Sequence, residues 1–212
     1  MTPAALLLDL DGTLVDSEPR HIRAHQKFLA TVGLAIGPEI AAANIGKGDR
    51  AFYRTLMAER GVIGDADAWV TAKTNILMDL YRTEGLPLQP GVERLLAQAA
   101  ASGVFCHIVT SAERRLCVLS LEVTGLAQRL PARICHEDVL RHKPNPEPYL
   151  LAASRLCVPP ERCWVIEDSA TGVRSGVAAG CHVIAVAGLV PVADLKAAGA
   201  HEVVTSLEAV GW

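Results

Sequence analysis

Two carboxylates follow directly on a short apolar run near the N-terminus. Asp9 and Asp11 come after residues 5–8, which read Ala-Leu-Leu-Leu, and Gly12 comes next. A continuous apolar run is typical of a buried strand in a parallel sheet. Because alternate strand residues share a face, both acids are expected on one side, at the edge where open α/β folds bind ligands. Two acids this close repel each other, so the pair indicates a cation, a shared proton or a catalytic role.

Polar residues also follow later apolar runs. The set consists of Thr110 and Ser111 after residues 104–109, Lys143 in the proline-containing loop 141–146, and Glu167 and Asp168 after residues 163–166. In a parallel α/β fold these strand ends converge on one crevice. Acids that can hold a metal, a lysine for an anion and a hydroxyl for hydrogen bonding together suit phosphoryl transfer.

Each later residue also has a simpler interpretation on its own. Thr110 could cap a helix that begins at Ala112, and Lys143 could be an ordinary surface lysine. Glu167 and Asp168 could provide favourable negative charge at the start of a helix. The order and context of these residues favour the chemical interpretation over the separate structural ones.

The apolar pattern predicts the elements that must position these side chains. Strands are expected at residues 5–8, 104–109, 132–135, 163–166, 181–186 and 201–204, with helices at 92–102, 112–123, 146–156 and 170–179. Strands that alternate with helices indicate a doubly wound, Rossmann-like parallel sheet.

A second pattern interrupts this alternation. Residues 17–85 carry helical periodicity only, with helices expected at 19–32, 38–43, 49–60 and 65–84. The sequence therefore predicts a catalytic core of residues 1–16 and 86–212 with an inserted all-α cap domain of residues 17–85. The two crossings are rich in Pro and Gly, which is typical of a hinge pair.

The ordered motifs resemble those of the haloacid dehalogenase-like (HAD) hydrolase superfamily. The matching features are an apolar strand before Asp-x-Asp-Gly-Thr, a second before Thr110, Lys143 before Pro144, and Glu167-Asp168 after a third. The resemblance implies that Asp9 is the nucleophile that forms an aspartyl phosphate and that Asp11 is the general acid and base. It implies Mg²⁺ held by Asp9, the Asp11 carbonyl and Asp168, with Glu167 close by or acting through water.

The same resemblance assigns the phosphate contacts. It implies that Lys143 offsets negative charge shared by Asp9 and the phosphate. Thr110, with the backbone amides of Ser111 and Gly12, would hold the phosphate oxygens.

The inserted helices resemble the cap of the subgroup that includes phosphoglycolate phosphatase and β-phosphoglucomutase. Such a cap closes over small phosphorylated molecules and excludes water. By this resemblance Lys47, Arg50 and Lys73 are candidate contacts for a second anionic group, and His21 helps to position a sugar and Asp11. A solvated surface position is the alternative for all four residues.

These features predict a Mg²⁺-dependent phosphatase that acts on a sugar phosphate, phosphoglycolate or a similar small metabolite. A β-phosphoglucomutase-like phosphotransferase is the alternative, distinguished by glucose 6-phosphate formed from β-glucose 1-phosphate with little release of inorganic phosphate. A haloacid dehalogenase is disfavoured because it needs neither Mg²⁺ nor an acid at Asp11. A receiver-like regulatory phospho-acceptor is opposed by the cap and by Asp11, which would discharge the phosphoryl group.

Composition restricts the partners and the setting. The net charge of −3 argues against nucleic acid or an anionic membrane as the main partner, and no apolar run is long enough to span a bilayer. The start of the chain lacks the features of a signal peptide, so a cytoplasmic protein is expected, as a monomer or weak homodimer. The six cysteines form no Cys-x-x-Cys pair and are expected to be free thiols.

Replacing Asp9 tests the central assignment. Asp9→Asn is expected to abolish turnover because an amide cannot serve as the nucleophile. The measurement is phosphate release by the purified variant. Substantial residual release from a pure sample would remove Asp9 from this role.

Overall fold

The computed structural model describes residues 2–37, 40 and 48–212. The chain divides into two compact units, one formed by Met1–Asp16 with Pro87–Trp212 and the other by Ser17–Leu86. Lys47 and most of the helix expected at residues 38–43 lie outside the described residues. We refer to the two units as the sheet unit and the helical unit.

The sheet unit contains a six-stranded, all-parallel sheet, which confirms the doubly wound α/β fold expected from the sequence. The strands are β1 Ala5–Leu8, β2 Phe105–Val109, β3 Arg133–Ile134, β4 Cys163–Glu167, β5 His182–Val186 and β6 Glu202–Val204. Their spatial order is β3-β2-β1-β4-β5-β6. All four residues of β1 are buried, as expected for a central strand that is covered on both faces.

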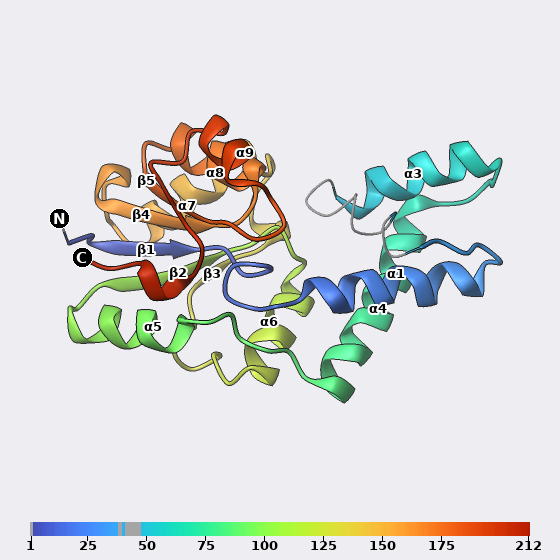
Figure 1. Cartoon of the computed structure of the whole chain (residues 1–212), viewed down its shortest axis with the longest axis horizontal. Coiled ribbons are helices and arrows are strands. Elements are labelled where there is room, and N and C mark those ends of the chain that lie inside the picture. The colour runs from blue at the N-terminus through green and yellow to red at the C-terminus, as the bar shows by residue number, and fades with distance from the viewer. Residues whose placement is uncertain (1, 38–39, 41–47) are drawn as a thin grey trace. The chain divides into compact units, whose positions relative to one another are not determined.

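Helices cover both faces of this sheet (Figure 1). They are α5 Val92–Ala101, α6 Arg114–Val123, α7 Glu147–Arg155, α8 Ala170–Ala178 and α9 Val192–Ala197. Helices α7, α8 and α9 share one core with the sheet, in which Tyr149, Val173 and Leu195 pack around Leu7 and Val165. Helices α5 and α6 lie on the opposite face (Figure 1).

Two details differ from the sequence prediction. Helix α6 begins at Arg114 rather than at Ala112, because the Thr110 side chain instead bonds the Ala112 amide in a turn. Helix α9 was not predicted; it has only six residues, and Leu195 is its one fully buried apolar side chain, which leaves little periodic signal.

The strand order places the polar residues that follow β1, β2 and β4 at the centre of the sheet. The chain builds β2 and β3 on one side of β1 and then returns to add β4 on the other side. Leu8 lies opposite Ile108 of β2 and Ile166 of β4. The residues that follow these three strands therefore meet at the reversal point of the sheet, which is where doubly wound folds bind their ligands.

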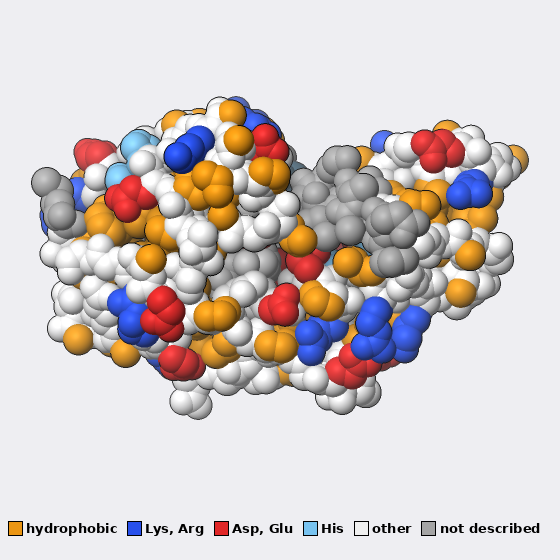
Figure 2. Space-filling view, in the orientation of Figure 1, with side chains coloured by type: hydrophobic (Ala, Val, Ile, Leu, Met, Phe, Trp, Pro, Cys, Tyr) orange, Lys and Arg blue, Asp and Glu red, His pale blue; other side chains and the backbone are white. Residues whose placement is uncertain are grey.

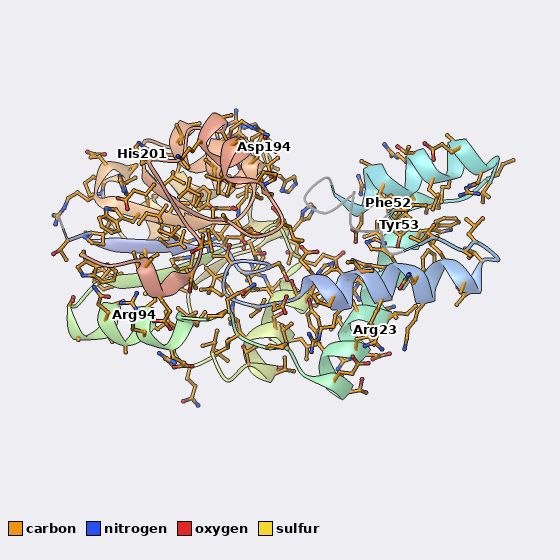
Figure 3. All side chains as sticks on the ribbon, viewed as in Figure 1. Arg23, Phe52, Tyr53, Arg94, Asp194 and His201 are labelled. Atoms are coloured by element: carbon orange, nitrogen blue, oxygen red, sulfur yellow. The ribbon has the colours of Figure 1, made fainter. Side chains whose placement is uncertain are left out.

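The described part of the helical unit contains α1 Glu18–Thr31, α3 Asp49–Arg60 and α4 Ala66–Glu84. Aromatic rings form the centre of its core (Figure 3). Tyr53 packs edge to face against Phe28 and Trp69, each with ring centroids 5.5 Å apart. Such pairs add stability beyond their buried area, which helps to hold the small helical unit together.

A buried polar network also crosses this unit. Lys73 Nζ donates to Asp49 Oδ2 at 2.8 Å and contacts His21 Nδ1 at 2.9 Å, although the Lys73 side chain is only 1% exposed. Asp49 Oδ1 lies 3.4 Å from His25 Nε2, and His25 Nδ1 bonds the Tyr53 hydroxyl at 2.8 Å. Burial by itself raises the pKa of Asp49, but the charge of Lys73 and the His25 hydrogen bond outweigh it and lower the pKa.

The surface carries charges of both signs. On the face in view, basic side chains are interspersed with acidic ones on each unit (Figure 2). Within the described part of the chain, no helix combines the length and the apolar character needed to cross a membrane.

Removing the Asp49 charge tests this network. Asp49→Asn is expected to lower the free energy of unfolding by about 3 kcal/mol at pH 7, because it leaves the buried Lys73 ammonium without its counter-charge. The folded-state pKa of Asp49 is lowered, so the contribution of the carboxylate is present above the unfolded value of 3.8 and is lost as the pH falls below it. Urea denaturation at pH 7 and pH 3 measures the difference.

Asp67 offers the matched control. Its carboxylate pairs with Arg50 at the surface, where both side chains are exposed. Asp67→Asn is expected to cost less than about 1 kcal/mol. Equal effects of the two variants would contradict the importance of the buried network.

Candidate active site

Asp9 is the first residue beyond β1 and is 8% exposed. Its backbone amide continues the ladder by donating to Ile166 O at 3.0 Å. The chain then turns tightly, with Gly12 at φ +82° and the Gly12 amide bonded to Val15 O. This turn keeps the Asp9 carboxylate at the end of the sheet.

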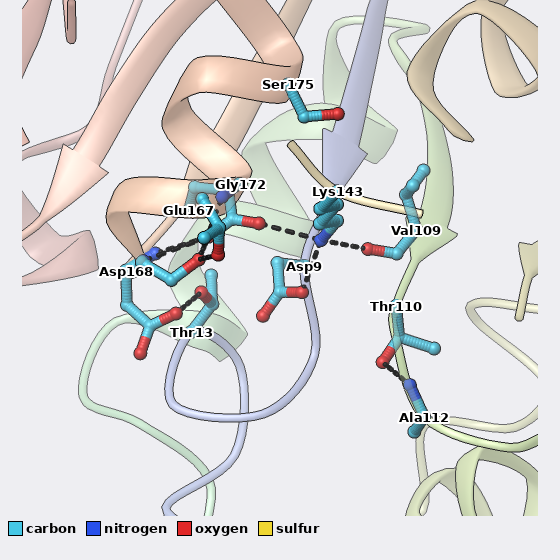
Figure 4. A network of polar contacts seen from close by, with 12 residues as sticks. Asp9, Thr13, Val109, Thr110, Ala112, Lys143, Glu167, Asp168, Gly172 and Ser175 are labelled. Carbon is cyan, nitrogen blue, oxygen red and sulfur yellow. Dashed lines mark hydrogen bonds and ion pairs between the residues drawn. The ribbon is translucent and has the colours of Figure 1, made fainter. Parts of the chain in front are cut away.

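Lys143 joins three strands at this point (Figure 4). Its Nζ donates to Asp9 Oδ1 at 2.7 Å, to Val109 O at 2.8 Å and to Glu167 Oε1 at 2.7 Å. The side chain is 5% exposed, so the surface-lysine interpretation is wrong. The ammonium has three donors, and all three are used by groups at the ends of β1, β2 and β4.

Glu167 is fully buried and accepts hydrogen bonds at both oxygens. Oε1 accepts from Lys143 and from the Tyr149 hydroxyl at 3.0 Å. Oε2 accepts from the Asp168 and Ser169 amides and from the Ser169 hydroxyl. With its oxygens occupied in this way, Glu167 is suited to orienting Lys143 rather than to direct metal coordination.

Two glycines make room for the acidic side chains. A Cβ on Gly172, in the first turn of α8, would lie 1.6 Å from Glu167 Oε1. A Cβ on Gly12 would lie 2.1 Å from Asp168 Oδ2. At Gly12 the loop after β1 therefore approaches Asp168 more closely than a side chain with a Cβ would permit, and at Gly172 the first turn of α8 does the same with Glu167.

Asp168, which follows β4, contacts the loop after β1. Its Oδ1 accepts a hydrogen bond from the Thr13 hydroxyl at 3.3 Å (Figure 4). Oxygens of Asp9, Glu167 and Asp168 all lie within 4.8 Å of one another. Asp9 and Asp168 offer the hard oxygen donors that Mg²⁺ prefers, so these two residues fit such an ion, with Glu167 close by.

The electrostatics also favour a cation here. Burial raises the pKa of Asp9 to about 7, with the Lys143 ammonium opposing the shift and Glu167 adding to it. Burial alone lowers the pKa of Lys143, but Asp9 and Glu167 outweigh it, and the pKa is raised well above its usual value. One ammonium faces three clustered carboxylates, so a divalent cation would relieve their repulsion.

Thr110 follows β2 and is 5% exposed. Its Oγ1 accepts from the Ala112 amide at 3.0 Å, so the hydroxyl hydrogen remains to be donated (Figure 4). Thr110 does not cap α6, whose N-cap is Glu113. Ser111 is exposed in the turn between them.

The candidates in the helical unit have different surroundings. Lys73 is buried and joined to His21 and Asp49, so it is not the solvated residue that the alternative interpretation describes. Arg50 is exposed and paired with Asp67. Lys47 lies outside the described residues.

Sequence reasoning missed several residues that support the site. Tyr149 supports Glu167, Gly172 makes room for it, and the Ser175 hydroxyl donates to Asn145 O at 2.6 Å, tying α8 to the Lys143 loop. A glycine in the first turn of a helix after Glu-Asp-Ser was a usable signal, because glycine disfavours helices unless it permits a close approach. Tyr149 and Ser175 carried no comparable signal.

Gly172→Ala tests the support of Glu167. Alanine favours a helix more than glycine does, so a loss of function would have to come from the clash with Glu167. Moving Glu167 and Lys143 together is expected to lower phosphate-releasing activity by about 100-fold. The overpacking is expected to lower the free energy of unfolding by about 1–3 kcal/mol.

The control is Gly188→Ala, since a Cβ at Gly188 meets nothing within 4 Å. It is expected to match the unmodified protein in both activity and melting temperature. Full activity of Gly172→Ala would show that the position of Glu167 is not critical.

Known proteins are similar to this chain over most of its length. A family model described as haloacid dehalogenase-like hydrolase matches residues 6–186. The chain is 40% identical to hexitol phosphatase A of Escherichia coli over 186 residues, covering 85% of this chain and 81% of the relative. It is 33% identical to the plasmid-encoded phosphoglycolate phosphatase of Cupriavidus necator, covering 97% and 90% of the two chains.

A solved structure gives the same result. CbbY from Rhodobacter sphaeroides, in complex with xylulose 1,5-bisphosphate, superposes with a TM-score of 0.87 at 25% identity and covers 99% of this chain and 97% of its own. The family model and these relatives cover most of the chain, and the chain belongs to the haloacid dehalogenase-like hydrolases.

Proposed function

We propose that this chain is a phosphatase that hydrolyses a small phosphorylated metabolite through an aspartyl-phosphate intermediate. The observation that carries the proposal is the Lys143 ammonium bonded to Asp9 and Glu167 at the reversal point of the sheet, with Asp168 beside them. The relatives named as phosphatases of hexitol phosphate, phosphoglycolate and N-acetylmuramic acid 6-phosphate support it.

Asp9 is the nucleophile in this proposal. Lys143 holds Oδ1, which orients the carboxylate so that Oδ2 can attack the phosphorus. As the Asp9–phosphorus bond forms, the bond to the leaving oxygen breaks, and Asp11 protonates that oxygen. The Thr110 hydroxyl and the amides of Ser111 and Gly12 hold the phosphoryl oxygens.

Hydrolysis of the intermediate restores the enzyme. Asp11, now ionised, removes a proton from a water molecule that attacks the phosphorus. The Asp9–phosphorus bond breaks, and Lys143 stabilises the carboxylate that is released. Inorganic phosphate leaves, and Asp11 returns to its protonated state.

Asp9, the backbone carbonyl of Asp11 and Asp168 would hold Mg²⁺, the ion that this family generally uses. When bound, the ion supplies positive charge close to the phosphoryl oxygens. Glu167 would contribute indirectly by orienting Lys143, because its own oxygens are occupied by protein donors.

The helical unit, in our proposal, is a cap that selects the remainder of the substrate. Arg50 and Lys73, its described candidate cations, are each paired with an aspartate. A cation that is already neutralised attracts a second anionic group weakly, whereas an ammonium beside a carboxylate offers a donor and an acceptor for hydroxyl groups. This favours a sugar or polyol phosphate over phosphoglycolate, and His21, which contacts Lys73, is a candidate contact for the same hydroxyls.

A phosphoglucomutase-like transfer is the second candidate. It uses the same Asp9 chemistry but passes the phosphoryl group to a sugar hydroxyl instead of to water. The similarity to relatives named as phosphatases favours hydrolysis.

A substrate panel tests the proposal. Purified protein is expected to release inorganic phosphate from hexitol and sugar phosphates with a kcat/KM about tenfold or more above that for phosphoglycolate. Chelation of divalent ions is expected to abolish release, and added Mg²⁺ to restore it. Conversion of β-glucose 1-phosphate to glucose 6-phosphate without phosphate release would establish the mutase instead, and full activity in chelator would exclude the metal.

A further inference from the structure

A glutamine to which the proposed reaction gives no role contacts the turn after β1. The Gln89 side-chain amide Nε2 donates to Gly12 O at 3.1 Å, although the two residues are 77 positions apart in the chain. Gln89 is half-buried, and both residues belong to the sheet unit. The hydrogen bond therefore holds the residue directly next to Asp11, the proposed general acid.

The backbone of Gln89 is fixed on both sides. Its backbone amide donates to Leu14 O at 2.9 Å, and its carbonyl accepts from the Val92 amide at 3.3 Å, at the start of α5. Next to it, Leu88 forms an antiparallel bridge with Val15. A side chain that extends from such an anchored backbone loses little further freedom when it forms a hydrogen bond. Gln89 can therefore hold the turn in one place.

Gly12 is the most easily rotated residue of this turn. Its φ is +82°, and glycine has no side chain to restrict the rotation of the neighbouring peptides. Thr13, on one side of it, is fully buried and donates to Asp168 Oδ1 at 3.3 Å, so it is held by contacts of its own. Asp11, on the other side, is half-buried. The direction of the Asp11 carboxyl group therefore depends on how Gly12 is held.

We propose that Gln89 is a positioning residue for Asp11, which it orients through the Gly12 carbonyl. This rests on the proposed function, in which Asp11 protonates the leaving oxygen. As the Asp9–phosphorus bond forms and the bond from phosphorus to that oxygen breaks, the proton of Asp11 passes to the oxygen. Without the hydrogen bond from Gln89, the turn has more conformations, and fewer of them place the acid for this transfer.

The demand for a general acid depends on the basicity of the leaving group. The p-nitrophenolate ion is a weak base and leaves phosphorus without a proton, whereas the alkoxide that leaves benzyl phosphate is a strong base and needs one. Both compounds carry a single aromatic ring. A variant that misplaces Asp11 therefore loses activity on benzyl phosphate and largely keeps it on p-nitrophenyl phosphate. General damage to the site lowers both activities.

The experiment measures kcat/KM for both compounds with the purified full-length protein and with Gln89→Met. Methionine is similar to glutamine in length but cannot donate this hydrogen bond. The ratio of kcat/KM for benzyl phosphate to that for p-nitrophenyl phosphate is expected to fall by about tenfold, which is part of the effect of a general acid. If Gln89→Met folds poorly, Gln89→Glu replaces it. Glutamate has the same shape and is ionised at neutral pH, so it has no donor and is expected to lower the ratio similarly.

Gln98→Met is the matched control. Gln98 is also half-buried in the sheet unit, and its Nε2 donates to the backbone carbonyl of Trp212 at 3.4 Å. Its ratio is expected to equal that of the unmodified protein. An unchanged ratio in the folded Gln89 variant, or an equal fall in Gln98→Met, would overturn this proposal alone. An unmodified protein that releases no phosphate from these compounds or from sugar and hexitol phosphates would refute the proposed function and, with it, this role of Gln89.

Discussion

The candidate site depends on one buried ammonium. Lys143 has no solvent to stabilise its charge, so its three donors must be satisfied by the ends of three different strands. Asp9 and Glu167 provide the opposite charge, and Val109 provides a backbone carbonyl. Because a buried charge without partners is costly, these strand ends are held in one arrangement, and the Asp9 carboxylate is oriented as a consequence.

Close backbone approach is the second constraint. Gly12 and Gly172 permit Asp168 and Glu167 to come nearer to neighbouring chain than a Cβ would allow. The acids can then cluster tightly enough to fit a cation, although clustering makes them repel one another. A bound cation and Lys143 together would balance this charge, so the site is built for a ligand rather than for stability.

The helical unit also contains a buried ammonium, that of Lys73. Its buried lysine is balanced within the unit, by Asp49, and His25 and Tyr53 anchor that carboxylate to the aromatic core. In the sheet unit the charges converge on a place where substrate and metal would bind. The helical unit therefore neutralises its buried lysine within itself, whereas the sheet unit gathers several carboxylates around one lysine at the edge of its sheet.

The sequence alone determined the parallel α/β fold, the position of nearly every strand and helix, and the residues at the strand ends. It could do so because apolar runs, helical periodicity and the Asp-x-Asp-Gly-Thr, Lys-Pro and Glu-Asp motifs are local signals. Helix α9 was missed because six residues with one buried leucine carry little periodicity.

Only the tertiary structure decided how these residues are used. The sequence could not distinguish a surface lysine from the buried Lys143, or separate the role of Glu167 from that of Asp168. It also could not show that Lys73 lies against Asp49. The physical reason is that burial, hydrogen-bond partners and charge balance arise from segments far apart in the chain. No local sequence pattern predicts which of these segments come into contact.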